Sequence, residues 1–282
     1  MHPTTPNQVH NTEHRERTAP APTMSGIQNL TEEKPPVDIT TISHKEKQEL
    51  IAADSVSVTS SITLAPDDSF HPVKSLRIDA KGTPVLRLPL PLKELETGIY
   101  NQDGSLAYLS ARERRSSGNC VLSNADGKQT ISTTYFFGPG RDPVLHLLGH
   151  GLEAKEVDIK TASKWTSRSQ KFVLPDGRTF DWEYKRAKGF GDGGKKGAAL
   201  VLSMQGKKIA ILVRNSETRT EGSKSCSAGN GGELVLGEHV GQLDGLSEDV
   251  VVATCLLMLK KEVDRRRTVQ FMMISAAISG GS

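Results

Sequence analysis

The chain has 282 residues, of which 36 are lysine or arginine and 33 are aspartate or glutamate, so its formal net charge is only +3. A dedicated nucleic-acid-binding domain carries a larger positive excess, and nucleic acid is therefore an unexpected partner. The three cysteines, Cys120, Cys226 and Cys255, are widely spaced and form no C-x-x-C pair. This argues against a disulfide scaffold and against a zinc site, and it fits a reducing compartment, so we expect an intracellular, cytoplasmic protein.

Residues 1–70 are expected to form a disordered N-terminal tail. They are rich in Pro, Thr, Ser, Glu and Lys and poor in aromatic residues. Such a segment cannot bury enough apolar surface to offset the ~1–2 kcal/mol per residue that ordering the backbone costs. The chain begins with no apolar run, which predicts that there is no secretory signal. The single folded domain is therefore placed at residues 71–282.

From residue 71 onward, short runs of alternating or continuous apolar residues are separated by turn residues, a pattern that predicts β-strands. The expected strands are 73–79, 84–88, 106–112, 119–123, 130–137, 142–148, 171–174, 179–184, 198–204, 209–214 and 233–237. Asn, Asp and Gly at 101–104 and 124–127 predict hairpin turns, because these residues tolerate positive φ. Many short strands without intervening helices predict a sandwich or barrel.

One late segment has a different character. Ser247 is a plausible helix N-cap, the acidic pair Glu248 and Asp249 suits a first turn, and residues 250–259 are almost entirely apolar. A helix without a polar face cannot lie on a surface, and ten residues rise only about 15 Å, too little to span a bilayer. We therefore expect a helix enclosed by a β-barrel. The last apolar run, 269–278, fits either a final strand or a continuation of this helix.

Several segments carry a family resemblance. Residues 98–108 (GIYNQDGSLAY), 172–183 (FVLPDGRTFDWE) and 209–213 (IAILV), followed by the apolar helix after residue 249, resemble the tubby C-terminal-like domain superfamily, in particular its fungal members. The chain is also similar to the LURP-one-related and phospholipid scramblase families. The resemblance covers residues 73–280 and implies a barrel of about twelve strands around a hydrophobic helix. For tubby itself the family function is phosphoinositide binding at the plasma membrane. No position matches its lipid-binding residues, so none is carried over.

Motifs that would indicate catalysis or a cofactor are weak. The glycines of 189–196 match G-x-G-x-x-G, but a predicted strand rather than a helix follows them, which favours a hairpin loop. His146 and His150 are four residues apart, but His146 lies on the expected strand 142–148 rather than on a helix, and no third metal ligand is apparent nearby. No G-x-S-x-G or cysteine-protease signature occurs. We therefore predict a protein that is not an enzyme, with no catalytic residue, no metal and no cofactor.

Basic residues form three clusters. The first two supply the candidate phospholipid-binding residues Arg112, Arg114, Arg115, Lys185, Arg186, Lys188, Lys195 and Lys196. The third follows the apolar helix and comprises Lys260, Lys261, Arg265, Arg266 and Arg267. Each charge near an anionic membrane contributes ~1 kcal/mol to binding. The alternative is an ordinary solvated surface, because acidic residues are nearly as numerous.

The function expected from these patterns is a non-enzymatic binding or adaptor domain of tubby-like type, which recognises anionic phospholipids such as phosphoinositides at a membrane surface. The alternatives are a protein-interaction module without a lipid role and a scramblase-like, lipid-handling protein. The sequence contains no segment expected to span a membrane. It carries no prediction of oligomeric state.

Overall fold

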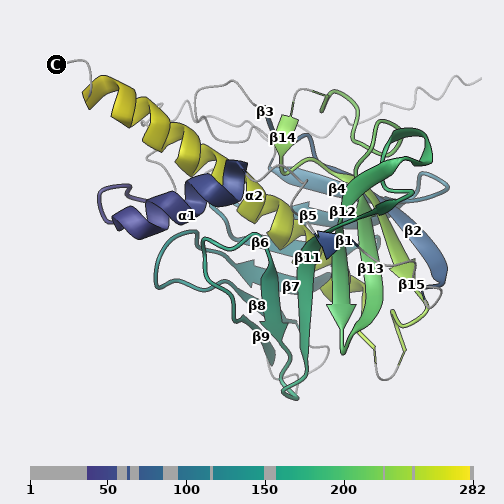
Figure 1. Ribbon diagram of the computed structural model, residues 1–282. Helices are drawn as coiled ribbons and strands as arrows, with labels where there is room; N and C mark the ends of the chain where they lie inside the picture. Colours follow the sequence, from purple (N-terminus) through teal and green to yellow (C-terminus); the bar gives the residue numbers. More distant parts are fainter. Residues whose placement is uncertain are drawn as a thin grey trace, which may run out of the picture. The chain divides into compact units, whose positions relative to one another are not determined.

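Twelve antiparallel strands close into a barrel (Figure 1). The computed structural model describes residues 37–55, 62–63, 70–84, 95–114, 117–148, 157–224, 226–242 and 245–279. In order around the barrel the strands are β11 (Thr179–Lys188), β10 (Gln170–Val173), β9 (Val157–Thr161), β8 (Val144–Leu147), β7 (Gln129–Thr134), β6 (Cys120–Asn124), β5 (Leu106–Ala111), β4 (Glu96–Asn101), β2 (Pro72–Asp79), β15 (Gly232–Gly237), β13 (Lys207–Val213) and β12 (Lys196–Met204). The barrel closes where β12 pairs with β11. The prediction of a mainly-β barrel is confirmed.

Shorter elements lie outside this ring. Strand β1 (Ile62–Thr63) pairs in parallel with β11, and β3 (Thr83–Pro84) pairs with β14 (Cys226–Ala228). The Gly-rich loop holds a single 3-10 turn, η2 (Asp192–Gly194), between β11 and β12. This loop connects two paired strands, as its sequence predicts.

The predicted hairpin turns are formed. The amide of Gly104 donates to the carbonyl of Asn101 between β4 and β5, and the amide of Gly127 donates to that of Asn124 between β6 and β7, both at 3.0 Å. Both glycines have positive φ, which explains their position in these turns. Sequence patterning misses β9, in which Ile159 is the one buried aliphatic side chain. Of the expected strand 84–88, residues 85–88 lie outside the described part of the chain.

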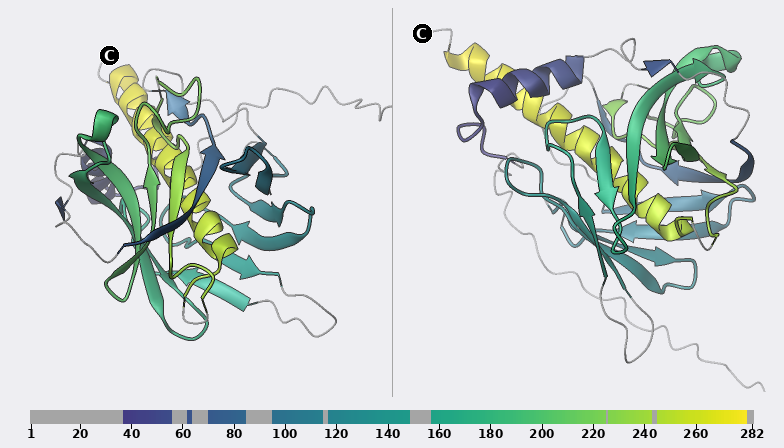
Figure 2. Two further views of the ribbon diagram at one scale, coloured as in Figure 1. Left: turned by 90° about the vertical axis from the view of Figure 1, so that its right-hand side faces the viewer. Right: turned by 60° about the horizontal axis from the view of Figure 1, so that its bottom comes forward.

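Helix α2 (Glu248–Ser279) supplies the centre of the core. Its first turns lie between the strands of the barrel, and its C-terminal part projects beyond them (Figure 2). Val251, Val252 and Met258 are fully buried. The indole Nε1 of Trp182, on β11, donates to Oγ1 of Thr254 at 3.0 Å, so the helix and the wall share a buried hydrogen bond. The prediction of a buried apolar helix is confirmed.

The final apolar run of the sequence continues this helix. Residues 269–278 all belong to α2, so the strand alternative is wrong. Val269 and Met272 are buried, whereas Met273 and Ile278 are 57% and 75% exposed. Among the described residues, no helix combines the length and apolarity that crossing a membrane requires.

The third basic cluster is inside the protein, which corrects the expectation of a solvated or lipid-facing surface. Lys260, Lys261, Arg265 and Arg267 are between 3% and 8% exposed, and Asp264 on the same helix is fully buried. The barrel tolerates these charges because partners meet them. Lys260 Nζ, for example, lies 2.6 Å from Oδ2 of Asp264, and Lys261 Nζ donates to Oε1 of Gln170 at 2.6 Å.

Part of the predicted tail is folded. Residues 44–55 form helix α1 (His44–Ser55), which packs against α2 and buries Leu50 completely. The prediction of disorder is wrong for this stretch, because its polar side chains find partners on the barrel domain. Trp165 Nε1 donates to Oε1 of Glu46 at 3.0 Å, and Thr166 Oγ1 donates to Oε2 of Glu49 at 2.9 Å. Residues 1–36 of the predicted tail lie outside the described residues.

Candidate functional site

A cavity of about 360 Å³ lies where α1, α2 and the ends of β11, β12 and β13 meet. We call it the arginine cavity. Its lining includes six arginines and two carboxylates, namely Arg168, Arg186, Arg214, Arg219, Arg265, Arg266, Asp54 and Glu262. Four positive charges therefore remain in excess in a confined space.

One arginine and one carboxylate of the cavity form a fixed pair. Arg214, at the end of β13, holds Glu262 of α2 through two hydrogen bonds, from Nη1 to Oε2 at 2.8 Å and from Nη2 to Oε1 at 3.1 Å. The amide of Gly229 also donates to Oε2 of Glu262 at 2.8 Å. Burial raises the pKa of Glu262 to about 7, while this amide and the charges of Arg265 and Arg168 oppose the rise. The Glu262 carboxyl group is thus held in place by Arg214 and the amide of Gly229.

An aromatic ring sets the position of two cationic groups. Tyr184 of β11 lies beneath the guanidinium of Arg168, which is 4.4 Å from the ring centroid, and near that of Arg214 at 5.7 Å. Its hydroxyl accepts a hydrogen bond from Nη2 of Arg214 at 3.3 Å. Because side chains alternate along a strand, Trp182, Tyr184 and Arg186 share one face of β11. The alternation that buries Trp182 therefore also directs Arg186 to the cavity.

Several cavity arginines have an unsatisfied donor. The Nε atoms of Arg186, Arg219, Arg265 and Arg266 are buried, and they have no hydrogen-bond partner within the described residues. Arg265 is only 4% exposed. Burial lowers the pKa of Arg265, and the carboxylates of Glu262 and Asp54 counteract this effect. A buried donor without a partner is costly, so these groups have unused capacity for an acceptor.

The second carboxylate of the cavity comes from α1. Asp54 accepts a hydrogen bond from Nη1 of Arg266, which lies on α2. The side chain of Asp54 is 11% exposed. The arginine cavity is therefore closed on one side by a helix that is separate from the barrel wall.

This geometry suits the binding of an anion. Guanidinium groups present several N–H donors in a planar fork that matches carboxylate and phosphate oxygens. Among the residues that the structure describes, no group of three or more His, Cys, Asp or Glu side chains is placed to hold a metal ion. The arginines of the cavity offer an anion hydrogen bonds and charge pairing.

The sequence-predicted site residues separate into two regions. On the β11–β12 hairpin, Arg186 lines the arginine cavity, whereas Lys185 lies on the opposite face of the strand, 3.6 Å from Glu183. Lys188 lies opposite Lys196 in the backbone register of β11 and β12, at the exposed end of this hairpin. Lys195 and Lys196 line a neighbouring surface hollow, which Arg214 and Arg219 also border.

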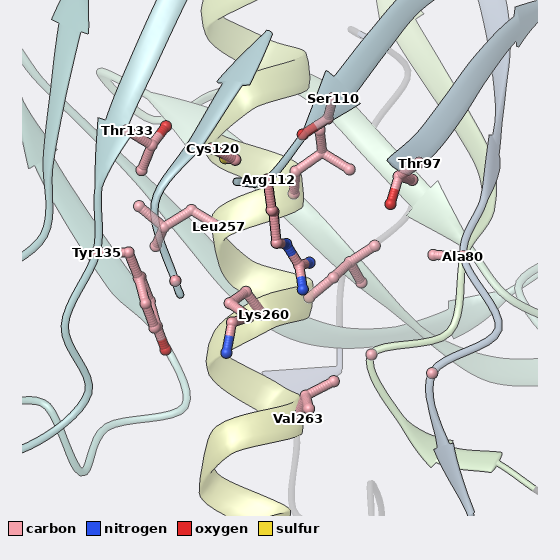
Figure 3. Close-up of a pocket in the computed structure, with 15 residues that line it drawn as sticks. Ala80, Thr97, Ser110, Arg112, Cys120, Thr133, Tyr135, Leu257, Lys260 and Val263 are labelled. Atoms are coloured by element: carbon pink, nitrogen blue, oxygen red, sulfur yellow. The ribbon is translucent and has the colours of Figure 1, made fainter. Parts of the chain in front are cut away.

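The other predicted residues lie apart from the hairpin. Arg112 follows β5 and lines a small cavity of about 30 Å³ together with Lys260 and Tyr135 (Figure 3). There the Lys260 ammonium lies 5.3 Å from the centroid of the Tyr135 ring. Arg114 is exposed, and Arg115 lies outside the described residues. The eight predicted residues therefore do not form one site.

Sequence reasoning missed most of the arginine cavity. Arg168, Arg214 and Arg219 are isolated in the sequence, and only the fold brings them together. Arg265 and Arg266 belong to the third basic cluster, for which the sequence predicts a solvated or lipid-facing surface. One sequence feature could have indicated that these residues are buried. They are arginines in a segment that directly continues an apolar helix, and arginine is the cation suited to buried ion pairs.

His146 takes part in a chain of contacts across three strands. Its Nδ1 lies 2.7 Å from Oδ1 of Asp158 on β9, and its Nε2 lies 3.1 Å from Oγ1 of Thr134 on β7. These are cross-strand contacts on neighbouring strands of the barrel. His150, the other histidine of this pair, lies outside the described residues.

Comparisons of the chain with protein-family models, with curated proteins and with solved structures give no match. The fold itself is consistent with the tubby-like resemblance: a closed barrel of twelve antiparallel strands with a long C-terminal helix packed against it.

Proposed function

We propose that the protein is a non-enzymatic binding domain of tubby-like type that recognises anionic phospholipid head groups, of the phosphoinositide class, at a membrane surface. The observation that carries this proposal is the arginine cavity, where six arginines face two carboxylates. A protein that kept this charge only for stability would pair it more completely, because unpaired buried charge is destabilising.

Phosphate is the anion that the cavity suits best. A phosphate monoester carries about −1.5 to −2 charge at pH 7 and offers three strong acceptor oxygens. One such group can accept hydrogen bonds from several N–H donors at once. The unsatisfied Nε groups of Arg186, Arg219 and Arg265 are among the donors of the cavity. Two phosphate groups match the excess of four positive charges.

The exposed end of α2 supports a membrane as the source of this ligand. Residues 268–279 contain no charged side chain, and Met273, Ile274 and Ile278 are exposed. Met273 follows the cavity residue Arg266 by seven positions, roughly 10 Å along a helix. A bilayer surface offers anionic head groups beside an apolar layer, and so meets both features. The same apolar end favours a second candidate, a protein-interaction module without a lipid role.

The test is co-sedimentation of the full chain with phosphatidylcholine vesicles, with and without phosphatidylinositol bisphosphate, at low and high salt. We expect binding that requires the phosphoinositide and weakens with salt. The double variant Arg186→Gln, Arg219→Gln removes two cavity charges and should weaken binding by at least about tenfold, or 1.4 kcal/mol.

A matched control makes the same change in net charge at positions outside the arginine cavity. The variant Lys188→Gln, Lys195→Gln also removes two positive charges, but from the exposed end of the β11–β12 hairpin. It should retain most of the binding. Equal losses in both variants would mean that a diffuse basic surface binds the vesicles rather than the cavity, and no binding by the wild-type chain would contradict the proposed function.

A further inference from the structure

We propose that helix α1 is a built-in competitor for the arginine cavity. In this proposal the Asp54 carboxylate occupies the place of a ligand anion beside Arg266, and an incoming anionic ligand displaces it and releases α1 from the barrel. The inference rests on the proposed function of the cavity and adds its regulation.

The two carboxylates of the cavity differ in how they are held. Glu262 belongs to the central helix, is 5% exposed and is fixed by Arg214 and by the amide of Gly229. Its backbone belongs to the buried part of α2 and so cannot move away with α1. Asp54 belongs to α1 and reaches the cavity only through the docking of that helix on α2. Asp54 is therefore the cavity anion that a local movement removes.

The docking of α1 is weak in apolar contact. Of its twelve residues, Leu50 is the one that is buried, and Ile51 is 39% exposed. The other anchors of the helix itself are polar, such as the Glu46–Trp165 and Glu49–Thr166 hydrogen bonds, which water can replace. Val37 and Ile42, which precede α1, are buried in the core and would keep the preceding segment attached when α1 is released. A helix of this length is only marginally stable alone, so α1 needs the docked position to stay helical.

Charge links the two events. A ligand phosphate and the Asp54 carboxylate compete for the same guanidinium of Arg266. By linkage, any change that loosens α1 must tighten ligand binding, and ligand binding must loosen α1 to the same extent. This reciprocity gives the proposal two independent readouts.

The first readout is affinity. Calorimetric titration of the full chain with inositol hexakisphosphate, a soluble polyphosphate probe, is compared for the wild type, Asp54→Asn and Leu50→Ala. Asp54→Asn removes the competing charge, and Leu50→Ala weakens docking without changing any charge of the cavity. Both should bind the probe roughly fivefold tighter or more. Asp103→Asn, in the β4–β5 turn, makes the same change in net charge away from the cavity and should bind like the wild type.

The second readout is the fluorescence of Trp165, whose indole contacts Glu46 of α1 and packs edge-on against Phe137 at a centroid distance of 5.2 Å. The other tryptophan, Trp182, is fully buried in the barrel. Saturating probe should shift the Trp165 emission of the wild type towards that of Leu50→Ala without probe. A Trp165→Phe variant should abolish this shift and so assigns the signal.

The outcomes separate the inference from the function on which it rests. Normal probe binding by the wild type, with Asp54→Asn no tighter than Asp103→Asn, overturns the competitor role and leaves the cavity as a binding site. Tighter binding by Leu50→Ala alone also overturns it, because the carboxylate would then not be the competing group. If neither the wild type nor Asp54→Asn binds the probe or phosphoinositide vesicles, both proposals fail.

Discussion

Two consecutive segments of α2 are buried to a similar extent and have opposite chemistry. Residues 250–259 are apolar apart from Thr254, and they fill the barrel by ordinary transfer of apolar surface from water. Residues 260–267 include seven charged side chains, of which all but Arg266 are less than 9% exposed. The second segment is stable only because its charges meet partners on α2 or on the barrel wall. The contrast indicates that a buried donor without a hydrogen-bond partner, such as Nε of Arg265, points to a ligand.

The largest effect is expected in the apolar segment. Val252→Asp places a charge where no partner exists, because Val252 is fully buried among apolar side chains. The cost should be several kcal/mol, comparable with the whole stability of a domain, and the variant should not fold. Circular dichroism and thermal melting measure this. A cooperative transition near that of the wild type would show that the helix is not enclosed.

The charged segment should respond differently to single and paired changes. Glu262→Ala leaves Arg214 buried without its carboxylate and should cost about 3–5 kcal/mol in urea unfolding. The double variant Arg214→Met, Glu262→Met removes both charges and should lose much less, since an apolar pair of similar volume often replaces a buried ion pair at little cost. Equal losses in the single and the double variant would contradict the importance of pairing.

The burial of Lys261 in the charged segment should make the stability of the domain depend on pH. Burial lowers the pKa of Lys261 from 10.5 to about 7. Between pH 7 and 9 the unfolded chain therefore binds more protons at this site than the folded chain, and stability rises with pH by about 1 kcal/mol per unit. Two other buried groups change the stability mainly outside this pH range. Glu262, whose pKa is raised to about 7, does so below it, and Cys255, whose pKa is raised from 9.0 to about 12, does so above it.

The check is urea unfolding at pH 7, 8 and 9 for the wild type and for Lys261→Met. The wild type should gain stability along this series, and the variant should show a smaller slope, because burial also lowers the pKa of Lys260. A flat profile in the wild type would mean that Lys261 stays protonated, held by Gln170 and by the carbonyls of Lys164 and Ser169.

The barrel and its central helix were predictable because their signals are local. Alternating strands, Asn/Asp/Gly turns and an apolar run of helical length need no knowledge of contacts distant in the sequence. A local signal also existed for α1: Ser43 and Glu46 form a capping box, with Ser43 Oγ 2.6 Å from Oε2 of Glu46. The amino-acid composition of the segment does not indicate this helix, because the segment contains few apolar residues.

The arginine cavity was unpredictable for the opposite reason. Its members come from α1, α2, β11, the end of β13 and the loops that flank these elements, so their proximity exists only in the closed barrel. A basic run such as 265–267 reads as surface when it is judged by charge alone. Its burial follows from the position of the barrel wall, with Arg214 and Gln170 placed to receive α2.

The most direct test of the account is the Arg265→Met variant, measured for both stability and anion binding. Glu262 and Asp54 keep their bonds to Arg214 and Arg266 in this variant, so we expect a change in unfolding free energy below about 1 kcal/mol. Binding to phosphoinositide vesicles should fall at least about tenfold, because a donor reserved for the ligand is lost. A loss of about 3 kcal/mol in stability with unchanged binding would contradict the account and make Arg265 a structural residue.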